Sequence, residues 1–217
     1  VGFIPIANIV ALVVIIKTVN REIKFETARI RLDAGRAEER ICSTRYPILM
    51  VHGVFFRDYK FPDYWGRIPK ALEKNGARIY FGNQQSASSV ENSGRELARR
   101  IKELTEDTGC GKVNVIAHSK GGLDIRYAMS YCGIGRLIAS VTTVNTPHRG
   151  CKFAEYLLEK LPKTMQEKIA ESYNGIMKKL GDDSPNFMEA VTDLTASRCV
   201  EMDSLMEAPD SVFCRSI

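Results

Sequence analysis

The sequence predicts an α/β fold in which a mostly parallel sheet is flanked by helices. Short apolar runs alternate with stretches of helical periodicity between residues 46 and 150, the pattern of strands joined by crossover helices. The first run, residues 46–52, is almost continuously apolar, as in a strand covered on both faces. The 217 residues are 44% hydrophobic and 26% charged, which suits one large globular core.

Each predicted element carries its own boundary signals. Asp63 is the expected N-cap of the first helix and Gly76 its stop, because glycine readily takes the left-handed conformation that ends a helix. Ser88 and Glu91 form a capping box before the next helix, which ends at Gly109. The elements expected after the first strand are a helix over 62–75, a strand over 77–81, a helix over 88–109, a strand over 113–117, a helix over 121–131 and a strand over 141–145.

Two amphipathic stretches, separated by Pro162, follow Gly150. Their apolar residues recur at helical spacing: Phe153, Tyr156, Leu157 and Leu161 in the first, and Met165, Ile169, Tyr173, Ile176, Met177 and Leu180 in the second, which ends at Gly181. One interpretation is that both helices pack on the core. The other is a mobile lid over about residues 152–186, because Met- and Leu-rich faces suit a surface that closes over an apolar site.

The N-terminal segment has a different composition. Residues 1–16 are almost wholly apolar, and we expect a membrane anchor there, although 16 residues fall short of the roughly 20 that span a bilayer. The alternatives are a cleaved signal peptide and a buried N-terminal strand or helix. Residues 17–45 form a polar connector to a domain over 46–217. The protein is then membrane-anchored or secreted, and the mixed charges leave the side of the membrane undecided.

Charge and cysteine content exclude several classes of function. The net charge is only +5 with both signs interspersed, so no nucleic-acid partner is expected. The six cysteines include no CxxC pair, and no HExxH or phosphate-binding glycine motif occurs, so we expect neither a metal site nor a nucleotide cofactor. Cys199 and Cys214 lie close enough in sequence to be bridged in an oxidising compartment.

The segment Val-Asn-Val-Ile-Ala-His-Ser-Lys-Gly-Gly, residues 113–122, carries the chemistry. A strand runs into Ser119 and a helix opens directly after it, so the hydroxyl lies on a sharp strand-to-helix turn. Such a turn needs small residues two positions away on each side, and Ala117 and Gly121 meet this need. The structural alternative is an ordinary turn in which the serine caps a helix.

A second loop supplies what an acyl-transfer site also needs, namely two main-chain donors for the oxyanion. His52, Gly53 and Val54 follow the first strand, and the N–H groups of Val54 and Lys120 are the expected donors. Gly53 lets the main chain approach the substrate. We expect His52 to shape the loop through hydrogen bonds, and the Lys120 side chain to be solvated.

These motifs resemble the bacterial triacylglycerol lipase family of the α/β-hydrolase fold. The matching segments are residues 46–53, 63–69, 113–127 and 144–150, within a resemblance that covers roughly residues 46–200. The resemblance implies an α/β-hydrolase fold, hydrolysis of lipid esters through an acyl-enzyme on Ser119, a supporting role for His118, and a helical lid after Gly150. An acyltransferase using the same serine and a non-catalytic lipid-binding relative remain alternatives.

The serine also needs a histidine base and a carboxylate, which in this fold follow it in the order acid, then histidine. The only histidine after Ser119 is His148, and the only acid between them is Asp124. Asp124 lies more than one helical turn past the serine and points away, while His148 lies in a loop that shapes the lid entrance in the family. The resemblance therefore implies that the acid, the base, any calcium site and the disulfide partner of Cys214 follow Ile217.

Overall fold

The computed structural model describes residues 5–54 and 64–217, and its centre is a five-stranded sheet. The strands are β1 (Ile48–Val51), β2 (Ile79–Phe81), β3 (Val113–His118), β4 (Ile138–Val144) and β5 (Phe213–Ser216). They lie in the order β2-β1-β3-β4-β5, and every neighbouring pair is parallel. The expected parallel sheet is thus confirmed, and the carboxyl ends of all strands meet at one edge.

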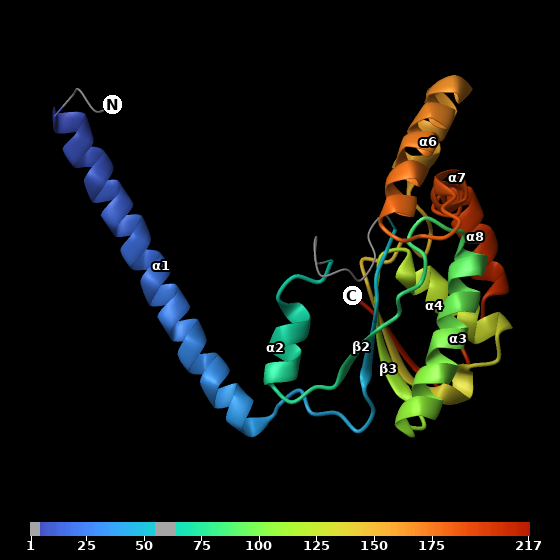
Figure 1. Cartoon of the computed structure of the whole chain (residues 1–217), viewed down its shortest axis with the longest axis horizontal. Helices are drawn as coiled ribbons and strands as arrows, with labels where there is room; N and C mark the ends of the chain where they lie inside the picture. Colours follow the sequence, from blue (N-terminus) through green and yellow to red (C-terminus); the bar gives the residue numbers. More distant parts are fainter. Residues whose placement is uncertain (1–4, 55–63) are drawn as a thin grey trace.

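Helices cover both faces of this sheet (Figure 1). Because successive strand residues point to opposite faces, Leu49 and Val51 pack against α3 (Val90–Thr108) and α4 (Gly121–Tyr131), whereas Met50 packs on the side of α2 (Ile68–Lys74). The larger core cluster joins residues of α3 and α4 to strands β1, β3 and β4. This three-layer arrangement fixes the turn between β3 and α4 at the edge of the sheet.

Several boundaries follow the sequence signals and others do not. Gly109 ends α3 with a φ of 61°, as expected. The predicted capping box is wrong by one residue: Ser89, not Ser88, accepts a hydrogen bond from the N–H of Asn92. Glu91 is therefore free of the cap, and it pairs with Arg95 at 2.8 Å.

Strands β1 and β2 and helix α3 each start two residues later than predicted, and larger differences occur at α2 and β4. The predicted start of the first helix was too early, because α2 begins at Ile68 with Pro69 in its first turn, where proline is readily accommodated. The predicted N-cap Asp63 lies outside the described residues. Strand β4 starts at Ile138, three residues before the predicted position.

After β4 the chain forms four helices before it returns to the sheet. These are α5 (Lys152–Lys160), α6 (Lys163–Lys179), α7 (Phe187–Thr192) and α8 (Ala196–Leu205). The two predicted amphipathic stretches correspond to α5 and α6, whereas α7, α8 and β5 were not predicted. In Figure 1, α6 and α7 lie at the end of the molecule toward which the strands run.

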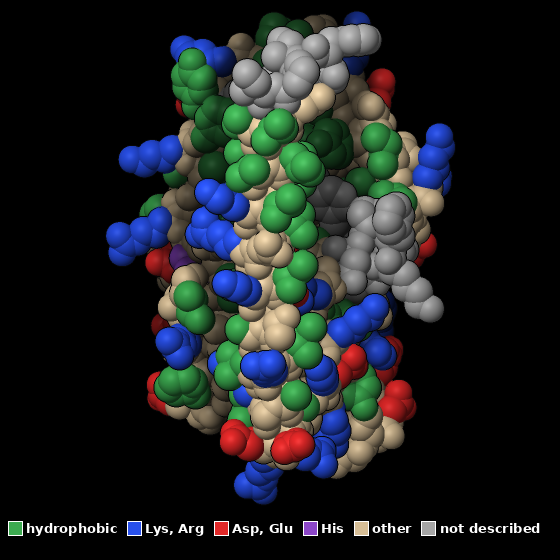
Figure 2. Space-filling model, turned by 90° about the vertical axis from the view of Figure 1, so that its left-hand side faces the viewer, with side chains coloured by type: hydrophobic (Ala, Val, Ile, Leu, Met, Phe, Trp, Pro, Cys, Tyr) green, Lys and Arg blue, Asp and Glu red, His purple; other side chains and the backbone are tan. Residues whose placement is uncertain are grey.

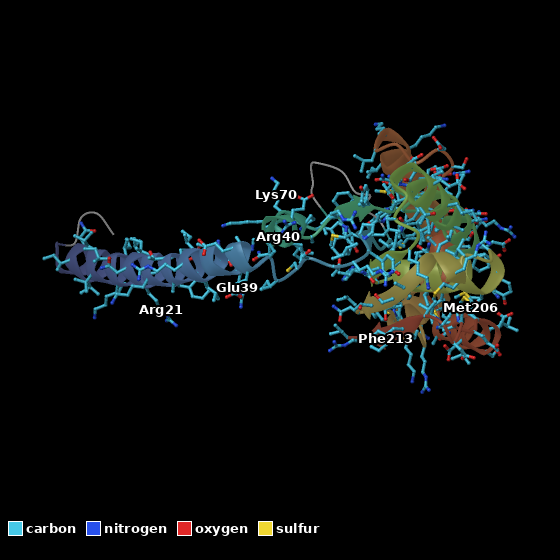
Figure 3. The ribbon with its side chains drawn as sticks, turned by 90° about the horizontal axis from the view of Figure 1, so that it is seen from below. Arg21, Glu39, Arg40, Lys70, Met206 and Phe213 are labelled. Carbon is cyan, nitrogen blue, oxygen red and sulfur yellow. The ribbon has the colours of Figure 1, made fainter. Side chains whose placement is uncertain are left out.

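The N-terminal region is a single helix, α1 (Pro5–Glu39), which includes most of the expected anchor and of the expected connector. It projects away from the body, and Figure 3 shows Arg21 and Glu39 on a rod that meets the body beside Arg40. There the N–H of Cys42 donates to the carbonyl of Asn75 at 2.9 Å. The structure does not support the alternative of a buried N-terminal element, because the large apolar side chains described between Ile9 and Leu32 are exposed.

Apolar side chains predominate near the N-terminal end of α1, and basic side chains join them further along (Figure 2). Among the described residues, the structure holds no helix that combines the length and the apolar character needed to cross a bilayer. All six cysteines are free, with Cys199 buried and Cys214 exposed, so the considered bridge between these two is absent.

Candidate active site

Ser119 lies on the abrupt turn between β3 and α4, at the carboxyl edge of the sheet. Its φ is 54°, in the left-handed region that serine rarely occupies. Its N–H donates to the carbonyl oxygen of Val144 on the neighbouring strand at 2.9 Å, which secures the turn. The residue is half-buried, so its hydroxyl is not sealed inside the core.

The residues around the turn are small because the main chain is crowded there. A Cβ atom at Gly121 would overlap the carbonyl oxygen of His52, and one at Gly53 would lie 2.8 Å from the Cβ of Ser119. Ala117 is fully buried within β3. A side chain at either glycine would therefore push apart the two loops that meet at the serine.

The two expected oxyanion donors come from neighbouring strands. Val54 follows β1 and Lys120 follows β3, and these strands pair in parallel with Val51 opposite Ala117. Within the described parts of the chain, the main-chain N–H groups of Val54 and Lys120 have no hydrogen-bond acceptor. Two unsatisfied donors beside a serine are what a developing alkoxide on a carbonyl substrate requires.

His52 is fully buried, and hydrogen bonds hold it between two loops. Its Nδ1 lies 2.7 Å from the carbonyl oxygen of Gly53, and its Nε2 lies 2.9 Å from that of Gln84. The Gln84 amide donates in return to the carbonyl of His52 at 3.0 Å. Both ring nitrogens of His52 thus contact main-chain carbonyl oxygens, which fits the loop-shaping role expected for this residue.

Tyr64 is a site residue that the motif search missed. Its hydroxyl hydrogen-bonds to Nδ1 of His118 and accepts the N–H of Gly53 at 2.9 Å, so it joins the two loops around Ser119. Burial lowers the pKa of His118, which favours the neutral ring that can accept the tyrosine proton. The sequence signals were that Tyr64 lies in the matching segment 63–69 and forms an aromatic pair with Trp65 near the start of the first expected helix.

The expectation of a solvated Lys120 side chain is wrong. Only 1% of it is exposed, and its ammonium forms an ion pair with Asp124 at 2.7 Å. The ammonium also donates to the hydroxyl of Ser93 at 2.9 Å. Burial raises the pKa of Asp124 to about 6, against the opposite effect of the Lys120 charge. Asp124 thus faces Lys120 and α3, away from the serine hydroxyl.

His148 is also engaged away from the nucleophile. Its Nδ1 lies 3.3 Å from a guanidinium nitrogen of Arg126, and its Nε2 lies 3.1 Å from the hydroxyl of Thr143. Burial, and then the charge of Arg126, lower its pKa. None of the three histidines hydrogen-bonds to the hydroxyl of Ser119, so the described residues bring together the expected nucleophile and the expected oxyanion donors without a base.

An apolar cavity of about 300 Å³ lies among the helices that follow β4. Its lining comes from α5, α6, α7 and the turns beside them and includes Phe153, Leu158, Leu161, Ile169, Phe187 and Met188. Phe153 is 66% exposed at its rim. In the described parts of the chain, no three His, Cys, Asp or Glu side chains are grouped to hold a metal ion.

Comparison with known proteins finds relatives of similar sequence among triacylglycerol lipases. No family model matches the chain. The chain is 40% identical over 134 residues to a triacylglycerol lipase of Burkholderia plantarii, in a match that covers 59% of this chain and 37% of the relative. A triacylglycerol lipase of Pseudarthrobacter phenanthrenivorans is 41% identical over 125 residues, covering 55% and 38%. One of Vibrio cholerae is 37% identical over 129 residues, covering 58% and 41%. The chain thus spans about two fifths of the length of these relatives.

Solved structures with a similar fold are lipases and esterases. A lipase of Bacillus licheniformis in its mature form superimposes with a TM-score of 0.58 at 22% identity, covering 78% of this chain and 64% of that one. A phospholipase of Legionella pneumophila gives 0.55 at 15% identity, covering 79% and 38%. A metagenomic carboxyl esterase gives 0.55 at 15% identity, covering 80% and 50%. The fold is therefore that of the α/β-hydrolases, as the sequence motifs implied.

Proposed function

We propose that this relative of the triacylglycerol lipases hydrolyses carboxylic esters of lipids, with Ser119 as the nucleophile. The observation that carries the proposal is the left-handed φ of 54° at Ser119, beside the unsatisfied N–H groups of Val54 and Lys120. A left-handed φ is energetically unfavourable for serine. We explain this strain by function, because the turn exposes the hydroxyl oxygen. The curated relatives support lipid esters as the substrate class.

The reaction follows from the geometry of the turn. The Ser119 oxygen attacks the ester carbonyl carbon and its proton passes to a general base, while the carbonyl electron pair becomes an oxyanion that the two N–H groups bind. The tetrahedral intermediate then expels the alcohol, which takes the proton from the base. Water hydrolyses the resulting acyl-enzyme by the same steps. The three histidines are engaged elsewhere, so we place the base and its acid outside residues 1–217.

The helices after β4 are proposed to act as the lid. Helix α6 lies at the end of the molecule toward which the strands run (Figure 1), and α5 and α6 expose Phe153, Tyr156, Met165 and Ile176. The cavity among α5, α6 and α7 offers an apolar lining in the same region. Exposed apolar side chains above an apolar cavity suit a cover that meets lipid and closes over an acyl chain.

We also propose that α1 associates with a lipid surface through its N-terminal part. The five consecutive apolar residues 12–16 are each at least 44% exposed, and five residues cover more than one helical turn. A protein groove would cover one side of this segment, whereas lipid covers every side. The N-terminal tip of α1 and the lid helices lie toward the same side of the molecule, so one surface can contact both (Figure 1).

Substitution of the nucleophile tests the catalytic proposal. In the full-length protein, Ser119→Ala is expected to lower kcat for a soluble p-nitrophenyl ester by at least about 1,000-fold and to abolish fluorophosphonate labelling. Its circular-dichroism spectrum should match that of the wild type. Ser130→Ala, on the exposed side of α4, is the matched control and should retain full turnover.

The same measurement separates the alternatives. Turnover that survives in Ser119→Ala would contradict the proposed nucleophile. An acyltransferase would give Ser119-dependent acyl transfer to an added alcohol in preference to water. A non-catalytic lipid-binding relative would bind vesicles without any Ser119-dependent turnover.

Vesicle sedimentation tests the role of α1. Leu12→Glu combined with Ile16→Glu places two charges on exposed apolar positions, and we expect binding to phosphatidylcholine–phosphatidylglycerol vesicles to fall at least tenfold. Val200→Glu combined with Leu205→Glu makes the same change on the exposed face of α8 and should leave binding intact. Equal losses in both variants, or no loss in the first, would contradict the assignment.

A further inference from the structure

The buried ion pair behind the nucleophile has no role in the reaction described above. The Lys120 ammonium is enclosed by α3 and α4: it lies 2.7 Å from Asp124, 2.9 Å from the hydroxyl of Ser93 and 3.4 Å from the carbonyl oxygen of Ser89. The side chains of Lys120 and Asp124 are only 1% and 2% exposed. Every polar partner of the ammonium therefore comes from the protein.

Stability alone does not explain this pair. Removing two charges from water has a large cost, and replacing a buried ion pair by apolar side chains of similar volume is often neutral or stabilising. The pair lies between the start of α4 and α3, and its partner Ser93 would keep a second hydrogen bond, to the carbonyl oxygen of Gln85 at 3.3 Å, if methionine and leucine replaced the pair. A charged pair at this position therefore needs another explanation.

The explanation lies in the main chain of the same residue. Lys120 precedes the first residue of α4, with φ −52° and ψ −34°, and its N–H is the proposed donor directly after the strained Ser119. The Lys120 side chain binds Asp124 in the same helix, α4, and Ser93 in the neighbouring helix, α3. The two helices approach closely, since a Cβ atom at Gly94 would lie 2.9 Å from the carbonyl oxygen of Asp124.

We propose that the Lys120–Asp124 ion pair is a positioning device that holds the Lys120 N–H toward the oxyanion formed on Ser119. This inference rests on the proposed function. Without the pair, the first peptide of α4 is free to rotate away from the direction that the oxyanion requires. An oxyanion donor acts in the transition state, so losing its alignment lowers kcat while KM stays unchanged.

A double substitution separates positioning from stability. Lys120→Met with Asp124→Leu replaces the pair by apolar side chains, so the melting temperature is expected to stay close to that of the wild type. In the full-length protein, kcat for a soluble p-nitrophenyl ester should fall at least tenfold with KM within twofold; losing one oxyanion donor outright costs about 100- to 1,000-fold. Leu104→Ala, a buried change in the core, is the control that lowers the melting temperature and keeps kcat.

A conservative variant covers the case in which the double variant does not fold. Asp124→Asn keeps an oxygen that can accept from the Lys120 ammonium, so kcat should remain within about threefold of the wild type. A wild-type kcat in the double variant, or a kcat lost equally in Asp124→Asn and the double variant, would overturn the positioning role. Turnover that does not depend on Ser119 would instead overturn the proposed function, and this inference with it.

Discussion

Backbone strain at single residues marks the edge of the sheet where the site lies. Three residues within two positions of a strand end have a positive φ: Asn83 after β2, Ser119 after β3 and Asn145 after β4. Asparagine adopts this conformation readily because its short side chain hydrogen-bonds locally, whereas serine has little such preference. The two asparagines need no functional explanation, and Ser119 does.

The sequence predicted the sharp turn at Ser119 but misjudged the environment of Lys120, the residue that follows it. The elbow was predictable because a buried strand, a serine with small flanking residues and a helix start all fall within ten residues. The i, i+4 spacing of Lys120 and Asp124 was visible too, but this spacing also occurs on solvated helix faces. Burial of the pair arises from α3, whose Ser93 lies 27 residues earlier, and no local pattern reports that packing.

The raised pKa of Asp124 predicts how the free energy of unfolding depends on pH. Its ordinary value is 3.8 and burial raises it to about 6, so between these values the folded state holds a proton that the unfolded state has released. Wild-type stability should therefore fall, by roughly 3 kcal/mol relative to Asp124→Asn, as the pH rises from about 3.8 to about 6. Urea unfolding of both proteins across this range measures the difference, and parallel curves would contradict the shift.

At the scale of elements, prediction succeeded where local signals and packing agree. Helix α4 has the predicted bounds, and α3 ends at Gly109, because apolar periodicity and glycine stops coincide there. Strand β5 escaped prediction because all four of its residues are exposed, so no apolar run or alternation marks it. Helix α7 has only six residues, too few to show a helical period.

The N-cap of α3 can be tested directly. Ser89→Ala removes the oxygen that accepts the Asn92 N–H at 3.2 Å, and we expect the free energy of unfolding to fall by about 1 kcal/mol. Chemical unfolding of Ser89→Ala and Ser88→Ala measures the contrast. A larger loss in Ser88→Ala would restore the capping box that the sequence suggested.

For the whole molecule, the main feature is the separation between α1 and the α/β body. The helix projects outward and meets the body around Arg40, whose side chain lies against Gly76 at the end of α2. The sequence marked residues 1–16 by their apolar character, but the single helix through residues 17–39 was not predicted. Its mixed charges give no clear apolar stripe, and the core clusters of the described residues contain no residue of α1.

Removing α1 tests this separation. A protein lacking residues 1–38 is expected to melt within about 2 °C of the intact chain, because the core clusters contain no residue of α1. Its far-UV signal per molecule should fall, since a long helix has been removed. A decrease in melting temperature of more than about 5 °C would show that α1 supports the body.

The chain reverses direction at Arg40, and this reversal determines how far the N-terminal end of α1 extends relative to the carboxyl edge of the sheet. Helix α1 descends from its tip and β1 runs back, so the chain has the outline of a hairpin with both tips facing one plane (Figure 1). A helix rises about 1.5 Å and turns about 100° per residue, so the length of α1 acts as a ruler. Seven extra residues would move the tip roughly 10 Å further along the helix axis with nearly unchanged facing. The carboxyl edge of the sheet would then lie that far short of any layer that the tip had entered.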